Sequence, residues 1–174
     1  SVRMTDTFCI LPFTHLSTRP DGAITPCCRS RDTLGSIRDM TFEEAWNSER
    51  QQQLRTDLLS GVRNKHCFQC WDMEDQGSMS MRQSMNKTRS HMIPETCEPI
   101  MPFEVPVLEL KMSNLCNFRC RTCKPDLSTT WLKDWAEVKH EYESLDLHND
   151  TKRQTNFDND QFVEDILKLA PTIE

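Results

Sequence analysis

The chain has 174 residues, of which 36% are hydrophobic, and its 27 acidic residues outnumber its 21 basic residues for a formal net charge of −6. No apolar run approaches the roughly 18 residues of a membrane-spanning helix, and no basic patch is available to neutralise phosphates, so membrane and nucleic-acid partners are excluded. The N-terminal residues lack the order of basic, apolar and small residues found in a signal peptide. We therefore expect a cytoplasmic protein.

The first element expected from the sequence is a β-hairpin. Residues 13–18 alternate in polarity, residues 19–22 (Arg-Pro-Asp-Gly) have turn chemistry, and residues 23–25 can return as the partner strand. Cys9 precedes this hairpin and Cys27 and Cys28 follow it. Closing the hairpin would bring these cysteines toward one point.

A helix is expected next. Thr41 and Glu44 form a capping box before an apolar face that runs to a stop at Gly61, with a break at residues 47–48. The chain then reaches Cys67 and Cys70. Residues 74–86 are polar and Met-rich without a clear period, and residues 87–104, with three prolines, predict a linker.

The remaining residues predict alternating strands and helices. An alternating stretch over 105–112 predicts a strand, which is followed by a cysteine-rich loop. A helical stripe begins near a cap at Ser128, a second amphipathic helix covers 162–169, and residues 172–174 could start another strand. The stripe comprises Trp131, Trp135, Val138, Tyr142 and Leu145. This alternation favours a parallel α/β sheet.

Nine cysteines are an odd number, and their spacing is typical of metal ligation rather than of a disulfide framework. The loop contains Cys116-x3-Cys120-x2-Cys123, and Cys67 and Cys70 form a separate C-x2-C pair. Three thiolates on one short loop can hold three irons of a cubane cluster and leave the fourth iron without a protein ligand. That open iron is a candidate site of chemistry.

Taken together, these residues resemble the radical S-adenosylmethionine (radical SAM) enzymes that carry a Twitch or SPASM auxiliary iron-sulfur domain. The C-x3-C-x2-C loop after a strand is similar to the cluster motif of that superfamily. The N-terminal half is similar to the auxiliary domain, whose pattern is a cysteine, a later Gly-x4-Cys and then a C-x2-C. Cys9, Gly22, Cys27, Cys67 and Cys70 match that pattern.

The resemblance implies two clusters. Cys116, Cys120 and Cys123 would bind a [4Fe-4S] cluster whose open iron holds S-adenosylmethionine, and Thr122, where the family often has an aromatic residue, would lie beside the adenine. Reductive cleavage of S-adenosylmethionine would give a 5′-deoxyadenosyl radical that abstracts hydrogen from an unknown substrate, with a peptide as one candidate. Cys9, Cys27, Cys67 and Cys70 would hold the auxiliary cluster, with Cys28 as an alternative to Cys27. A flavodoxin or ferredoxin would donate the electron.

The resemblance also predicts the fold class, α/β. A small α+β Twitch/SPASM-like domain over residues 1–86 would precede a linker over 87–104 and the start of a partial (β/α)6 barrel over 105–174. The auxiliary domain usually follows the barrel, so this order is the less common one. No glycine follows Gly77, so the family's Gly-Gly-Glu segment, which holds the methionyl amino group, is not in these residues. We expect the N-terminal part of an enzyme, inactive alone.

Two other classes of function remain open from the sequence. A hairpin with a C-x2-C pair equally suits a structural zinc site, so the chain could be a zinc-stabilised binding module without catalysis. A two-cluster electron carrier is the other alternative. Iron and acid-labile sulfide would distinguish the cluster proteins from the zinc module.

Overall fold

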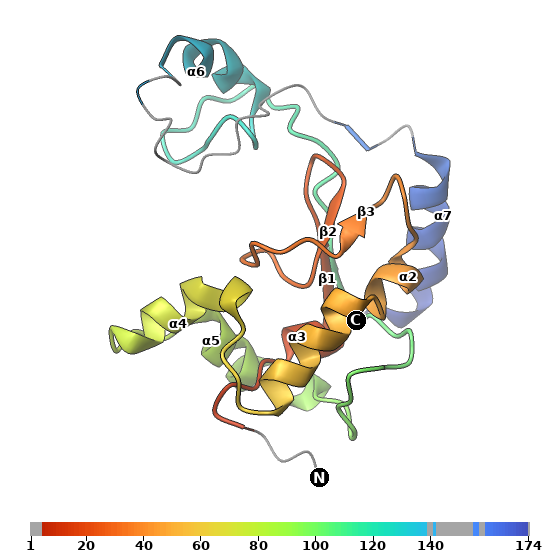
Figure 1. Ribbon diagram of the computed structural model, residues 1–174. Helices are drawn as coiled ribbons and strands as arrows, with labels where there is room; N and C mark the ends of the chain where they lie inside the picture. The colour runs from red at the N-terminus through yellow and green to blue at the C-terminus, as the bar shows by residue number, and fades with distance from the viewer. Residues whose placement is uncertain (1–4, 139–140, 142–154, 157–158, 174) are drawn as a thin grey trace.

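The computed structural model describes residues 5–138, 141, 155–156 and 159–173. Its centre is a mixed four-stranded sheet in the order β3-β2-β1-β4 (Figure 1). The strands are β1 (His15–Thr18), β2 (Ala23–Thr25), β3 (Gly35–Ser36) and β4 (Val107–Glu109). β2 pairs antiparallel with β1 and β3, whereas β4 pairs parallel with β1, with His15 opposite Val107.

The predicted hairpin is confirmed, with one difference at its start. Gly22 has a φ of +90°, which favours glycine, and its N–H donates to the carbonyl of Arg19 at 2.9 Å to close the turn. β1 begins at His15 rather than at residue 13, because Leu11–Thr14 forms the short helix α1. Pro12 in its first turn suits a helix start, and this local signal outweighs the alternation of polarity.

The predicted helical region with its break is also confirmed. α2 (Phe42–Trp46) begins at the capping box of Thr41 and Glu44, and α3 (Glu49–Leu59) begins at Ser48, whose side chain accepts from the Gln51 N–H. Gly61, at a φ of +79°, follows the end of α3.

Residues 74–86, in which the sequence shows no clear period, include the end of one helix and most of another. The 3-10 turn η1 (Lys65–Cys67) leads into α4 (Phe68–Asp75), and α5 (Met81–Thr88) follows, with the turn η2 (Ser90–Met92) after it. A second capping box, made by Ser80 and Gln83, starts α5. The one fully buried side chain of α5 is Arg82, and the apolar side chains that pack against the core from this helix are only Met81 and Met85, so its hydrophobic pattern is short.

The segment 87–104, expected as a linker, packs on the N-terminal helices. Met101 is buried in the core, and its backbone exchanges two hydrogen bonds with the side-chain amide of Asn47. Trp46 Nε1 donates to the carbonyl of Pro102 at 2.7 Å, and Arg55 Nη1 donates to that of Pro99 at 2.9 Å. The junction of α2 and α3 therefore fixes the path of the chain toward β4.

The C-terminal part contributes two separate packing units. The turn η3 (Thr129–Trp131) and α6 (Leu132–Val138) lie with the cysteine loop apart from the sheet (Figure 1). The predicted helix over 162–169 is confirmed as α7 (Asp160–Leu169), which packs against α2. No strand begins at Thr172 or Ile173, where the sequence suggested one, because Pro171 and Thr172 lie in the 3-10 turn η5 (Ala170–Thr172); Glu174 lies outside the described residues. The start of a (β/α)6 barrel stays a prediction, and Tyr142 and Leu145 lie outside the described residues.

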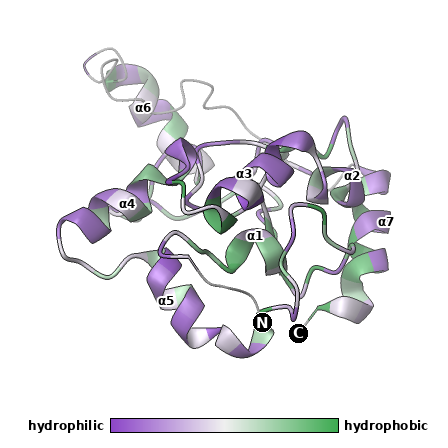
Figure 2. Ribbon diagram, turned by 60° about the horizontal axis from the view of Figure 1, so that its bottom comes forward, coloured by the Kyte–Doolittle hydropathy of each residue, from purple (hydrophilic) through white to green (hydrophobic). Residues whose placement is uncertain are grey.

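One hydrophobic core joins these elements. It includes side chains of α1, β1, β2, α2, α3 and α7, together with Trp71, Met101 and Val105. Figure 2 shows the apolar α1 in the middle of the molecule, with strongly hydrophilic residues on α3, α4 and α5. None of the helices in the described residues is long and apolar enough to cross a membrane.

Candidate iron-sulfur site

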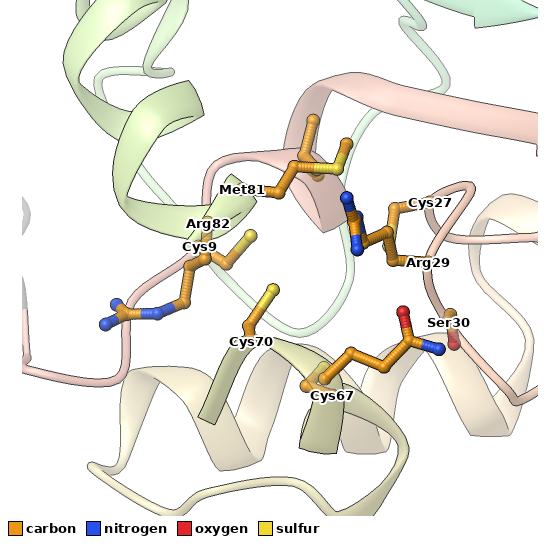
Figure 3. Close-up of a pocket in the computed structure, with 10 residues that line it drawn as sticks. Cys9, Cys27, Arg29, Ser30, Cys67, Cys70, Met81 and Arg82 are labelled. Carbon is orange, nitrogen blue, oxygen red and sulfur yellow. The ribbon is translucent and has the colours of Figure 1, made fainter. Parts of the chain in front are cut away.

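Four cysteines from three segments of the chain line one pocket. Cys9 precedes α1, Cys27 follows β2, Cys67 ends η1 and Cys70 lies in the first turn of α4. The pocket contains about 390 Å³ of space outside protein atoms, part of it open solvent. In Figure 3 the Sγ atoms of Cys9 and Cys70 lie in the same space in the middle of the pocket. The other lining residues are Leu11, Arg29, Ser30, Gln69, Met81 and Arg82.

The loop that carries Cys27 is held by hydrogen bonds on both sides. Nδ1 of His15 donates to the carbonyl of Pro26 at 3.1 Å, which orients the peptide before Cys27. The Ser30 N–H donates to the Cys27 carbonyl at 3.2 Å, and Arg19 Nη2 donates to the Ser30 carbonyl at 2.7 Å. Cys27 therefore has a fixed backbone before any metal binds.

Asn64 organises the segment that carries Cys67. Its side chain accepts from the His66 N–H at 2.9 Å, and its carbonyl accepts from the N–H of Cys67 at 3.1 Å and from Nε1 of Trp71 at 2.9 Å. This turn directs Cys67 and Cys70 to one side of the helix start. The N-terminal end of α4 also carries a partial positive charge, which favours an anionic group beside Cys70.

Burial and repulsion between neighbouring thiols act on three of the four pocket cysteines. Burial, followed by the nearby thiol of Cys27, raises the pKa of Cys9 well above its ordinary value. Burial raises the pKa of Cys27 to about 11, and burial together with Cys27 and Cys70 raises that of Cys67 to about 12. With their pKa values raised in this way, the thiols of Cys9, Cys27 and Cys67 are protonated without a metal, and cation ligation would release their protons. The donor set fits a thiolate-bound metal centre.

Histidine 15 also connects the site to β4. Its Nε2 lies 3.7 Å from Glu109 Oε2, and Lys111 Nζ lies 2.9 Å from Glu109 Oε1. The His15 imidazole and then the Lys111 ammonium lower the pKa of Glu109 to about 2 despite its partial burial. Sequence reasoning left His15 unassigned, because a single histidine has no spacing signal.

The alternative ligand Cys28 is placed differently. It is exposed, it is not among the residues that line the pocket, and its Sγ lies 3.9 Å from Sδ of Met81. Of the two candidate ligands Cys27 and Cys28, it is therefore Cys27 that lines the pocket.

The second cysteine group lies on an exposed loop after β4. Cys116 and Cys123 are partly buried, and Cys120 and Thr122 are exposed. The Phe118 N–H points to the Sγ of Cys116 at 3.4 Å, a contact that favours a thiolate or a cluster sulfur ligand.

The cysteine loop is tied to the segment that follows it. Ser128 Oγ donates to the Phe118 carbonyl at 2.9 Å, and the Thr129 N–H donates to the Asn114 carbonyl at 2.9 Å. Arg119 pairs with Asp134 of α6 at 2.9 Å. The loop and α6 therefore form one local unit. Within the described ranges, no three His, Cys, Asp or Glu side chains are grouped to hold a single metal ion, at this loop or elsewhere.

Comparison with known families matches residues 9–71 to SPASM, an iron-sulfur cluster-binding domain. The matched range begins at Cys9 and contains Cys27, Cys67 and Cys70, so all four pocket cysteines lie within it. No curated protein and no solved structure matches the chain. The match supports the predicted auxiliary iron-sulfur domain in the N-terminal half.

Proposed function

We propose that this chain is part of a radical SAM enzyme, with an auxiliary iron-sulfur cluster in its N-terminal half and the S-adenosylmethionine-binding cluster on the loop after β4. The observation that carries the proposal is the convergence of four cysteines on one pocket inside the region similar to SPASM. The basic side chain of Arg29 also lines that pocket and suits the negative charge of a thiolate-ligated cluster.

The auxiliary cluster would be held by Cys9, Cys27, Cys67 and Cys70. Four thiolates complete the ligation of a cubane, so this cluster would have no open iron. Such a cluster suits electron transfer, which is the role we propose for it. The surrounding hydrogen bonds, from His15 to Pro26 and within the Asn64 turn, would keep the ligands in place when the cluster changes its charge.

The reactive cluster would be held by Cys116, Cys120 and Cys123. When bound, it would supply the electron that cleaves S-adenosylmethionine to the 5′-deoxyadenosyl radical. The chain's own contribution is positional, because the loop that carries the three thiols is pinned to residues 128–134. Thr122 would lie beside the adenine, and its exposed side chain leaves it free to do so.

The same proposal includes a substrate class and an electron donor. An unknown substrate, with a peptide as the favoured class, would provide the hydrogen atom. A flavodoxin or ferredoxin in the cytoplasm would supply the electron.

The proposal is tested by anaerobic reconstitution of the chain with iron and sulfide. We expect about eight irons per chain, matching sulfide, little zinc, and two overlapping EPR signals after reduction. A change of one signal on adding S-adenosylmethionine would support an open iron on the second cluster. Tightly bound zinc without iron uptake would instead indicate the non-catalytic binding module.

A further inference from the structure

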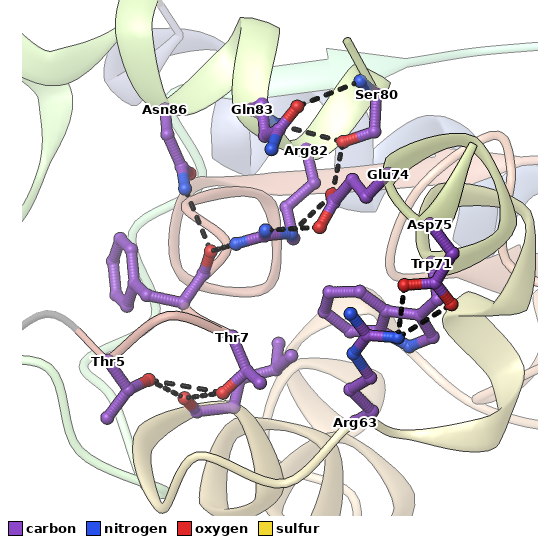
Figure 4. A network of polar contacts seen from close by, with 12 residues as sticks. Thr5, Thr7, Arg63, Trp71, Glu74, Asp75, Ser80, Arg82, Gln83 and Asn86 are labelled. Atoms are coloured by element: carbon purple, nitrogen blue, oxygen red, sulfur yellow. Dashed lines mark hydrogen bonds and ion pairs between the residues drawn. The ribbon is translucent and has the colours of Figure 1, made fainter. Parts of the chain in front are cut away.

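The backbone on both sides of Cys9 is held by two side chains of α5, a helix that lies beyond the SPASM-like range. Arg82 Nη1 donates to the Phe8 carbonyl at 2.6 Å, and Asn86 Nδ2 donates to the same oxygen at 2.8 Å (Figure 4). The Ile10 N–H in turn donates to Asn86 Oδ1 at 2.8 Å. The peptide groups before and after Cys9 are therefore both hydrogen-bonded to side chains of α5.

Arg82 also joins Cys9 to the helix that carries Cys70. Its Nε and Nη2 donate to the two carboxylate oxygens of Glu74 at 2.9 and 2.7 Å, and Glu74 lies on α4, one turn after Cys70. The Arg82 guanidinium lies 4.9 Å from the ring of Trp71. A planar, bidentate group in this position sets the separation of the two segments more strictly than a single charge would.

The central side chains of this network are buried. Arg82 is 7% exposed, and Ser80, which donates to Glu74 and caps α5, is 1% exposed. Residues 82 and 86 are one helical turn apart, so a single face of α5 presents both groups to the Cys9 segment. Neither Arg82 nor Asn86 has a thiol, so neither would be a ligand of iron.

We propose that Arg82 and Asn86 are positioning residues for the auxiliary cluster, which fix Cys9 relative to Cys70, and that α5 is thus part of the cluster-binding unit. The inference rests on the proposed function, since it requires a cluster at this pocket. Outer groups of this kind commonly change metal retention by 10- to 100-fold.

The test uses the full chain with Cys116, Cys120 and Cys123 changed to alanine, so that only the auxiliary site can bind. Asn86→Leu keeps the size of the side chain and leaves the pair of Arg82 and Glu74 intact. Arg82→Met removes every guanidinium contact, and Arg82→Lys restores the charge without the bidentate geometry. Arg63→Met is the matched control, because Arg63 stacks 5.4 Å from the same Trp71 ring and pairs with Asp75 at the surface.

Three readouts separate positioning from general stability: iron release to a chelator, the EPR spectrum of the reduced cluster, and the thermal midpoint of the metal-free chain. We expect Asn86→Leu and Arg82→Met to release iron about tenfold faster or more, with Arg82→Lys in between. Asn86→Leu loses two hydrogen bonds to the Cys9 segment and should lower the metal-free midpoint somewhat, but it should also change the EPR spectrum, which a loss of stability alone would not do. Arg63→Met should match the parent in spectrum and, within about twofold, in release rate.

Two results would overturn the proposal, and they are distinguishable. If the parent binds iron and sulfide but Asn86→Leu and Arg82→Lys keep its release rate and spectrum, the positioning role is wrong and the proposed cluster stands. If Arg82→Met fails to fold, Asn86→Leu alone decides the matter. If the parent takes up no iron, the proposed auxiliary cluster fails and the positioning role with it.

Discussion

The packing of α7 against α2 provides a direct test of how the two halves of the chain are joined. Phe162 of α7 is 2% exposed, and its ring centroid lies 5.7 Å from that of Phe42 at a tilt of 58°. Phe162→Ala would remove a buried ring that the surroundings can only partly replace. Replacing a buried phenylalanine by alanine costs about 3–5 kcal/mol, from lost transfer free energy and the cavity that remains. We expect the free energy of unfolding to fall by about 4 kcal/mol.

The assay is urea unfolding of the metal-free chain under reducing, oxygen-free conditions, followed by tryptophan fluorescence. Trp46 is fully buried beside α3 and reports on the N-terminal core. With a slope of about 2 kcal/mol per molar urea, the loss moves the midpoint down by about 2 M. With Trp131 and Trp135 changed to phenylalanine in every variant, the signal comes from Trp46 and Trp71 in the N-terminal half, although the substitution lies in the C-terminal half.

A control on the same helix makes this result specific. Leu167 is 66% exposed, and Leu167→Ala should change stability by less than about 0.5 kcal/mol. In a double-mutant cycle, Phe42→Ala and Phe162→Ala should show a coupling of about 1 kcal/mol. If Phe162→Ala moves the midpoint no further than Leu167→Ala does, α7 does not pack on α2, and residues beyond β4 fold independently of the N-terminal half.

Three further outcomes are expected. Cys120→Ala should lose the iron of one cubane, about four irons per chain, and keep the other cluster, whereas Cys67→Ala should lose the other cluster. Iron analysis and EPR spectroscopy check this. Loss of both clusters from either substitution would contradict two separate sites. Asn47→Ala removes both bonds to Met101 and the bond that Asn47 Oδ1 accepts from Arg55, and it should cost about 2 kcal/mol or more in urea unfolding. An unchanged midpoint would show that segment 87–104 is not held there. Glu109 has a pKa lowered to about 2, so its stabilisation is complete above the ordinary carboxyl range near 4 and is lost as pH falls toward 2. The midpoint difference between the native chain and Glu109→Gln should accordingly be present at pH 7 and vanish near pH 2, and a difference that grows with acid would contradict this assignment.

The elements predicted correctly from the sequence are those with local chemical signals. The turn at Gly22 and the capping box of Thr41 and Glu44 depend on residues only a few positions apart, and the structure has both. The helix α5 also has a local signal, the capping box of Ser80 and Gln83, but its buried side chain is a charged arginine. Met81 and Met85 pack against the core from the same helix, but two apolar residues around a buried arginine give too short a pattern for hydrophobic periodicity to detect.

The contacts between distant segments could not be predicted in this way. Alternation over 105–112 predicts a strand, but no property of those residues specifies β1 as the neighbour of β4. At the candidate site, cysteine spacing identified the four thiols that the structure brings to one pocket. Spacing could not nominate His15, Arg82 or Asn86, because each acts on a backbone group that only the folded chain brings near.

The strand pair β1 and β4 connects the two cysteine groups physically. β4 leads directly into the loop of Cys116, and its last residue, Glu109, lies against His15, which holds the peptide before Cys27. Without β4, one edge of β1 would lose its parallel partner and its backbone groups would need other partners. The SPASM-like range alone therefore lacks the strand that completes its sheet, the helix α5 that holds Cys9, and the helix α7 that covers Phe42. β4 thus lies between the sheet around the four-cysteine pocket and the segment that leads to the Cys116 loop, which itself packs apart from the sheet.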